Sequence, residues 1–344
     1  MKSHRNIPIF VPHLGCPNMC VFCNQKKISG HEKADFSSVK DEIEKALETV
    51  PADCEVQIAF FGGSFTGIDR EDMIYLLETA KEFIDSGRVD SIRLSTRPDY
   101  IDEEILDILL KYKVKTIELG IQSMDDGVLL KSGRGHTAKD TERACALINS
   151  YGFELVGQMM TALPGSTPEK EIYTAKRICE MGAKGARIYP TVVFRDTELF
   201  NMMERGEYIS RNMEDTVASA ADVLSVFIKN NVKVIRVGLQ SSELLVSGSE
   251  TASVYHESTG EFVWSRFFRN EVSEKLQKLE TSGKSAVIFV PRGYVSKMTG
   301  QKRSNIIYLK EKFSLSDIKV REDENLSDFE TKVILNERKQ DVCD

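Results

Sequence analysis

The chain has 344 residues, of which 41% are hydrophobic and 29% are charged, and its formal net charge is −7. This length allows a large buried core, and the acidic excess argues against a surface that coats nucleic acid through general basicity. The sequence contains no apolar stretch long enough to span a bilayer, and residues 1–13 lack the apolar core of a signal peptide. Seven cysteines, three of them clustered, fit a reducing compartment better than a disulfide framework, so we expect a cytoplasmic protein.

Short apolar runs alternate with amphipathic segments from residue 7 to about residue 240. Most of the runs are dense in Val, Ile, Leu and Phe, which is typical of strands buried on both faces. They occupy residues 7–12, 56–61, 91–96, 116–122, 154–160, 185–190 and 232–239. Repeated strand–helix units predict a parallel sheet with right-handed crossovers. We therefore expect an α/β fold in which residues 1–240 form a partial (β/α)6-type TIM-like barrel.

The pattern changes after residue 241. Residues 241–253 are expected to form a loop, followed by a long helix near 265–281, strands at 285–291 and 304–310, and a polar tail. This arrangement predicts a small C-terminal α+β domain over residues 241–344. Residues 291–312 carry six Lys or Arg against one acidic residue.

Three cysteines, Cys16, Cys20 and Cys23, follow the first predicted strand. This is the strand end at which β/α barrels carry their active sites. Three thiolates bind three irons of a [4Fe–4S] cluster and leave the fourth iron open to another ligand. The alternatives are a zinc site completed by His13 or His31, or cysteines that fill core space. Zinc modules usually supply ligands in paired blocks, and the sequence has no second block.

A glycine pair, Gly62 and Gly63, closes the second predicted strand and is followed by Ser64. Consecutive glycines at a strand end let another molecule approach the backbone closely. The alternative is an ordinary turn between a strand and a helix. The position one strand–helix unit after the cysteines favours a binding role.

The pattern C-x3-C-x-Phe-C resembles the radical S-adenosylmethionine (radical SAM) superfamily. The resemblance implies a [4Fe–4S] cluster that reductively cleaves S-adenosylmethionine to a 5′-deoxyadenosyl radical, with electrons from a donor such as a flavodoxin or ferredoxin. It also implies that Phe22 lies against the adenine and that Gly62, Gly63 and Ser64 form the motif that contacts the methionine amino group. This division of labour, in which the cofactor does the chemistry and the protein orients it, suits a strongly reducing reaction.

Further segments are similar to the catalytic subunit of the Elongator complex and, more weakly, to oxygen-independent coproporphyrinogen III oxidase. They cover residues 95–101, 118–124, 133–137, 157–167 and 188–199. The resemblance implies that Arg134 holds the cofactor carboxylate and that Gln122 and Gln158 contact its ribose. We expect one rim to collect these side chains together with Tyr189 and Arg195.

Some assignments near this rim stay open. Ser95 stands where relatives carry Glu. Arg97 either supports the site or pairs with Asp99, and His136 either donates a proton or caps the next helix. No catalytic residue is assigned.

The sequence departs from the Elongator subunits in two ways. The gap between the first two cysteines is shorter, and residues 241–344 contain no acetyl-CoA-binding signature. The leading hypothesis is a radical SAM enzyme that modifies a transfer RNA base. The alternatives are a radical SAM enzyme for a small molecule and a non-catalytic iron–sulfur protein.

The basic stretch in the C-terminal region bears on this choice. Lys297, Lys302 and Arg303, with Tyr294 nearby, have the side chains needed to contact RNA phosphates and to stack on a base. The stretch also fits a solvated hairpin loop between two strands. We expect no membrane partner.

Overall fold

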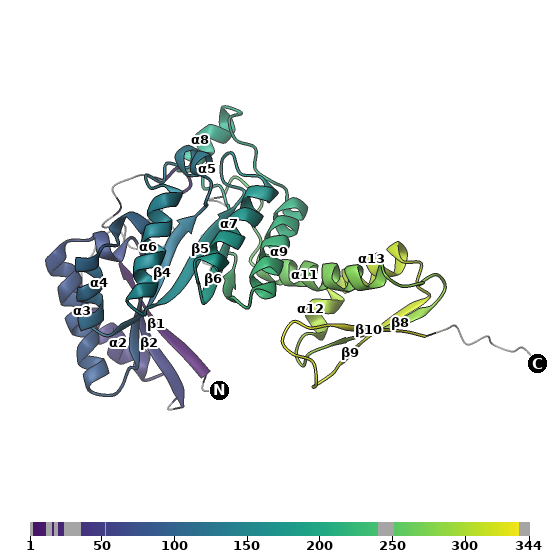
Figure 1. Ribbon diagram of the computed structural model, residues 1–344, viewed down its shortest axis with the longest axis horizontal. Coiled ribbons are helices and arrows are strands. Elements are labelled where there is room, and N and C mark those ends of the chain that lie inside the picture. Colours follow the sequence, from purple (N-terminus) through teal and green to yellow (C-terminus); the bar gives the residue numbers. More distant parts are fainter. Residues whose placement is uncertain are drawn as a thin grey trace, which may run out of the picture.

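The computed structural model describes residues 3–11, 16, 20–23, 36–51, 53–239 and 251–336. Within these residues the chain forms a large parallel sheet covered by helices and a smaller sheet beyond them (Figure 1). Among the described helices, none has the length and apolar character needed to cross a bilayer.

The large sheet has seven parallel strands in sequential order from β1 to β7. The strands are β1 (Ser3–Val11), β2 (Cys54–Gly62), β3 (Ser91–Thr96), β4 (Val114–Gln122), β5 (Glu154–Thr161), β6 (Gly185–Pro190) and β7 (Lys233–Val237). Strands β1 and β7 are its two edges, so the sheet is an open partial barrel. The expected fold class is confirmed, with seven strands.

Helices on the outer face of this sheet bury its apolar residues. They are α2 (Val39–Leu47), α3 (Arg70–Asp85), α4 (Glu103–Lys111), α6 (Ala138–Ser150), α7 (Pro168–Glu180) and α9 (Met213–Lys229). Two shorter helices, α5 (Asp126–Lys131) and α8 (Glu198–Glu204), lie beyond the carboxyl ends of the strands (Figure 1). Two short 3₁₀ turns, Phe65–Gly67 and Pro98–Tyr100, follow β2 and β3. Helix α7 begins as its sequence indicates, because Thr167 accepts a hydrogen bond from the Lys170 amide and Pro168 is the first helical residue.

The smaller unit combines helices with a three-stranded sheet in the order β10–β8–β9. Its elements are α11 (Thr259–Leu276), β8 (Ser285–Val290), α12 (Val295–Thr299), the 3₁₀ turn Gln301–Arg303, α13 (Ser304–Lys312), β9 (Asp317–Glu322) and β10 (Lys332–Asn336). Strand β8 is parallel to β9 and antiparallel to β10.

The strand expected at residues 304–310 is wrong, because this segment is helix α13. Ile306 and Leu309 are buried three residues apart, whereas Ile307 is 53% exposed, which is a helical pattern. The basic stretch 291–312 is therefore a helical crossover between two parallel strands, so the hairpin-loop interpretation is also wrong. The polar tail contains β9 and β10.

One hydrophobic core extends from the outer face of the barrel through α11 to the small sheet. Phe227 of α9, Phe267 and Phe268 of α11, and Ile288 of β8 all belong to it. The predicted domain boundary at residues 240/241 and most of the predicted loop 241–253 lie outside the described residues.

Candidate functional site at the carboxyl ends of the strands

The short turn at residues 20–23 is fixed between two helices. The Val21 amide donates to the Ser132 carbonyl at the end of α5 (3.1 Å). The Val21 carbonyl accepts from the Leu199 amide in the first turn of α8 (2.7 Å). Cys20 is buried, and its carbonyl accepts from the Cys23 amide (3.0 Å). Contacts from distant parts of the chain thus set the position of this cysteine segment.

Phe22 is half-buried beside the start of α8. It packs against a small apolar cluster that contains Val193, Leu199 and Tyr208. The Tyr208 hydroxyl donates to the Ala162 carbonyl (2.8 Å), which ties this cluster to the loop after β5. The ring of Phe22 is therefore held from the side of α8.

Arg134 brings the cysteine segment together with the end of β4. Its Nη1 lies 3.4 Å from the Cys20 sulfur, and its Nη2 donates to the Gly120 carbonyl (2.6 Å). The Arg134 carbonyl accepts from Arg97 Nη2 (2.5 Å), and Arg97 also forms a two-point ion pair with Asp99 (2.9 Å for each bond). Arg97 thus has both of the roles that the sequence left open: it pairs with Asp99 and it supports Arg134.

The glycine pair lies against the end of β1. Gly62 has a φ of +116°, and a Cβ atom there would lie 2.6 Å from the Val11 carbonyl oxygen, so no other residue fits without a shift. The Gly63 amide donates to the same carbonyl (2.8 Å). The buried Ser64 hydroxyl lies 3.3 Å from the Cys16 sulfur. The glycine pair and the cysteine segment therefore lie next to each other at the carboxyl ends of β1 and β2.

Gln122 ends β4 with a left-handed φ of +64°. A Cβ atom built on Gly120 would lie 3.2 Å from Gln122 Nε2 and 3.3 Å from Arg134 Nη2. Glycine at position 120 therefore leaves room for both polar side chains beside the strand end.

A buried ion network crosses the concave face of the sheet, and the sequence analysis missed it. Glu118 of β4 is fully buried and accepts from Arg93 of β3 (2.8 Å) and from Arg187 of β6 at both oxygens (2.6 and 3.0 Å). Arg93 Nε also donates to Gln57 of β2 (3.0 Å). Gln158 of β5 donates to Glu118 (2.9 Å). Five neighbouring strands are thus linked through their inward side chains.

Electrostatics explains why this network stays charged. Burial alone would raise the pKa of Glu118, but hydrogen bonds and charge interactions with Arg187 and Arg93 outweigh burial and lower that pKa. The sequence did carry a signal for it. Arg93, Glu118 and Arg187 each interrupt a strand that is otherwise buried, and buried ionisable groups need partners.

The expected rim is only partly assembled. Gln158 Nε2 lies 3.2 Å from the Ser95 hydroxyl as well as contacting Glu118, so it belongs to the buried network. Tyr189 lies in the same interior beside Arg187, and burial raises its pKa. Arg195 does not join these residues, because it is exposed with its guanidinium 5.9 Å from the centre of the Phe200 ring.

His136 is buried beside the site but does not cap α6. Thr137 caps that helix in a reciprocal arrangement with Asp140. His136 Nε2 lies 3.4 Å from the Ile121 carbonyl oxygen. Burial, followed by the charge of Arg134, lowers the pKa of His136 to about 4. The imidazole is therefore neutral at pH 7.

The donor set at this edge fits a [4Fe–4S] cluster with a polar cofactor. Within the described ranges, no three His, Cys, Asp or Glu side chains converge on one metal ion, whereas the thiolates of such a cluster each bind a different iron. Among the described side chains, the buried polar atoms near Cys20 and β4 that lack a hydrogen-bond partner include Arg97 Nη1, Gln122 Oε1, Arg134 Nε and His136 Nδ1. Buried polar atoms of this kind indicate a ligand at the site. His13 and His31, the zinc alternatives, lie outside the described residues.

Two family models match the chain. The radical SAM superfamily model matches residues 10–178, and the radical SAM C-terminal domain model matches residues 183–262. Elongator complex protein 3 from Saccharomyces cerevisiae is 27% identical over 266 residues, which are 65% of this chain and 47% of the relative. A tRNA uridine(34) acetyltransferase from Methanocaldococcus jannaschii is 30% identical over 212 residues, covering 59% of this chain and 38% of that protein.

A solved structure shares the fold. The archaeal Elp3 of Methanocaldococcus infernus superposes with a TM-score of 0.63 at 20% sequence identity, over 78% of this chain and 64% of that one. The chain spans about half the length of the Elongator relatives that it matches. The two matched models together cover most of the barrel and the start of the smaller unit. The chain belongs to the radical SAM superfamily of enzymes, whose cofactors are a [4Fe–4S] cluster and S-adenosylmethionine.

Proposed function

We propose that this protein uses Cys16, Cys20 and Cys23 to hold a [4Fe–4S] cluster that reductively cleaves S-adenosylmethionine, and that the reaction modifies a transfer RNA base. When bound, the cluster supplies one electron and the cofactor supplies a 5′-deoxyadenosyl radical for hydrogen abstraction. A low-potential flavodoxin or ferredoxin is the proposed electron donor.

The observation that carries the proposal is the contact between Arg134 and Cys20. The guanidinium reaches the cysteine sulfur with Nη1, while its Nε has no hydrogen-bond partner among the described residues. A fixed cation beside a proposed cluster ligand would suit the carboxylate of an amino-acid cofactor, because Arg–carboxylate pairs are strong and directional. The Gly120 carbonyl accepts from the guanidinium, and Arg97 fixes the backbone of Arg134 by donating to its carbonyl.

Other residues at the same edge have proposed binding roles. The backbone of Gly62 and Gly63, with Ser64, faces the methionine amino group, and Gln122 contacts the ribose through its unpartnered Oε1. Phe22 lies against the adenine. Gln158 contacts the ribose, and its hydrogen bond to Glu118 positions it from the buried network.

Transfer RNA is proposed as substrate because two of the relatives are transfer RNA modification enzymes by name. The M. jannaschii relative is a tRNA uridine(34) acetyltransferase. The matched region of the yeast Elongator protein covers less than half of that protein. The proposal therefore covers only the radical step of such a modification and does not include acetyl transfer.

Anaerobic reconstitution tests the proposal in two steps. The reconstituted wild-type protein with dithionite should form 5′-deoxyadenosine from S-adenosylmethionine, whereas Cys20→Ala should lose both the iron and this product. Cys145→Ala is the matched control, because Cys145 is a buried core residue of α6. A full cluster in Cys20→Ala would overturn the ligand assignment. Nucleoside mass spectrometry of transfer RNA from cells with and without the gene tests the substrate, and identical profiles would overturn it.

A further inference from the structure

The open face of the small sheet has a side-chain pattern that the proposed chemistry does not use. Its strands β10, β8 and β9 pair in a register that sets nine side chains in three rows. The rows are Asn336–Ser285–Asp317, Ile334–Val287–Lys319 and Lys332–Phe289–Arg321. The alternate residues, such as Ala286, Ile288 and Ile318, face α11, α12 and α13 and are buried.

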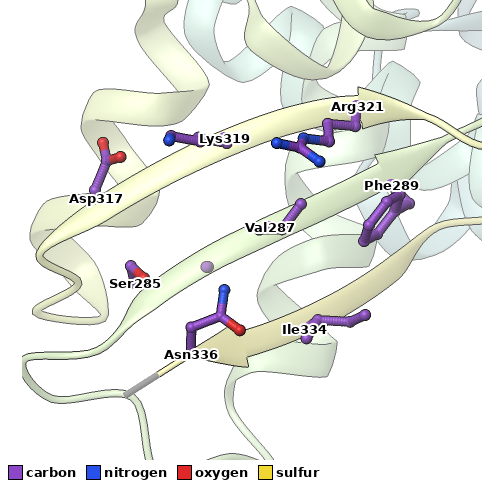
Figure 2. Close-up of a pocket in the computed structure, with 9 residues that line it drawn as sticks. Ser285, Val287, Phe289, Asp317, Lys319, Arg321, Ile334 and Asn336 are labelled. Carbon is purple, nitrogen blue, oxygen red and sulfur yellow. The ribbon is translucent and has the colours of Figure 1, made fainter. Parts of the chain in front are cut away.

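This face is exposed and forms a shallow groove. Eight of its nine residues, with Ala286, line an open pocket of about 380 Å³ (Figure 2). Figure 2 shows Lys319 and Arg321 along one side of β8 and Ile334 and Asn336 along the other, with Phe289 near the end of the groove. Ile334 is 39% exposed. Apolar side chains along the middle of a sheet face that none of the described helices covers are consistent with a binding surface.

The charge of the face is opposite to that of the chain. Lys319, Arg321 and Lys332 are exposed there against a single carboxylate, Asp317, whereas the whole chain carries a net charge of −7. Neither Lys319 nor Arg321 forms an ion pair with any residue in the described part of the chain. Phe289 lies on the central strand with a cation on each side of it in the same row.

We propose that this face binds a single-stranded segment of the RNA substrate, with a base stacked on Phe289 and phosphates paired with Lys319, Arg321 and Lys332. This inference rests on the proposed RNA substrate. Aromatic side chains on an exposed sheet stack unpaired bases, and flanking cations track the backbone. An acidic protein would satisfy the cations but leaves the flat aromatic position unexplained.

The basic stretch 291–312, for which the sequence left an RNA contact open, lies on a different side of the small sheet from this face. Lys302 and Arg303 lie in the crossover between α12 and α13, which is on the helical side of the sheet. The Lys297 ammonium lies over the rings of Trp264 and Tyr294 in cation–π contacts. The sheet face and the crossover therefore make separate surfaces that one experiment can compare.

Fluorescence anisotropy with three labelled probes tests the face: an unmodified transfer RNA transcript, an RNA hairpin with a single-stranded loop, and a fully paired duplex of equal length. The full-length reconstituted protein should bind the transcript and the hairpin more tightly than the duplex. Phe289→Leu should weaken hairpin binding about tenfold, since one base stack contributes roughly that much, and Phe289→Tyr should restore it. The slope of the logarithm of RNA affinity against the logarithm of salt concentration should fall in magnitude by about 1.4 in the double variant K319A/R321A, because two phosphate contacts are lost.

The matched control is K302A/R303A, which removes the same charge from the crossover. It should leave affinity and salt slope within about twofold of wild type. Equal losses in both double variants, a larger loss in the control, or equal binding of duplex and hairpin would overturn the proposal.

Formation of 5′-deoxyadenosine without RNA is measured on the same preparations. It should not change in the sheet variants, because the small sheet lies beyond α11, away from α5 and α8 (Figure 1). If wild type forms 5′-deoxyadenosine but binds no RNA, the RNA substrate and this face are both wrong. If wild type binds RNA and the sheet variants bind it equally well, only the face is wrong.

Discussion

Arg134 and Cys20 are 114 residues apart in the chain, yet the arginine Nη1 lies 3.4 Å from the cysteine sulfur. This contact joins the cysteine segment after β1 to the segment after α5. The guanidinium also donates to the Gly120 carbonyl, and Arg97 donates to the backbone carbonyl of Arg134. The buried Arg134 side chain therefore links Cys20 to the end of β4.

Replacing Arg134 should weaken binding of S-adenosylmethionine. For Arg134→Gln we expect a loss of about 10- to 100-fold in affinity, because a charge-assisted hydrogen bond contributes about 1.5–3 kcal/mol. Equilibrium dialysis with the reconstituted protein measures this. Arg195→Gln is the control, since Arg195 is exposed beside Phe200. Equal losses in the two variants would contradict the proposed role of Arg134.

Gly62 should tolerate no side chain. A Cβ atom there would lie 2.6 Å from the Val11 carbonyl oxygen, whereas at Gly87, which also has a positive φ (+75°), no atom lies within 4 Å. We expect Gly62→Ala to lower the free energy of unfolding by about 1–3 kcal/mol more than Gly87→Ala does, because it adds a clash to a φ of +116° that lies farther from the left-handed helical region. Urea denaturation measures both. Similar losses of unfolding free energy in the two variants would show that the end of β1 moves aside without cost.

Removing the charge of Glu118 should be strongly destabilising. Glu118→Gln leaves Arg93 and Arg187 buried without their carboxylate, so we expect the free energy of unfolding to fall by about 3–5 kcal/mol. The control is Glu55→Gln in β2, whose partner Lys115 is half-exposed, and there the loss should be under about 1 kcal/mol. A small loss at both positions would mean that the two arginines find water or other partners.

Stability should depend on His136 in mildly acidic solution. Its pKa is lowered from 6.5 to about 4, so the unfolded chain binds a proton at this residue below about pH 6.5 while the folded protein does not. The free energy of unfolding should therefore decrease as the pH falls from about 6.5 to 4, by up to about 3 kcal/mol from this residue.

Denaturation curves across this pH range test the effect in variants. His136→Gln should flatten the slope, and His256→Gln, at an exposed position, should keep it. An unchanged slope in His136→Gln would show that other groups cause the acid sensitivity.

The sequence predicted the barrel well and the small unit poorly. Strands β3 and β6 were expected at their observed bounds, because apolar runs between charged helices have few other interpretations. The run Asn305–Leu309 is short and rich in β-branched residues, and its periodicity alone does not separate a strand from a buried helix. Only its packing against α11 and β9 decides in favour of a helix.

In the candidate site too, some residues could be predicted from the sequence and others could not. The cysteines and glycines could be found because their spacing is local. The partners of Glu118 could not, since they come from strands that meet only in the folded sheet. Arg195 was expected at the rim because it closely follows β6, but the chain turns away before reaching it, and its side chain lies over Phe200.

The network around Glu118 also has a mechanical consequence. A closed barrel fixes its curvature by pairing its first and last strands, whereas in this sheet β1 and β7 are separate edges. Glu118 of β4 binds Arg93 of β3 and Arg187 of β6 on the concave side of the sheet. These ion pairs hold the three strands at a fixed curvature. The length of one glutamate side chain therefore helps to set the curvature of the open sheet.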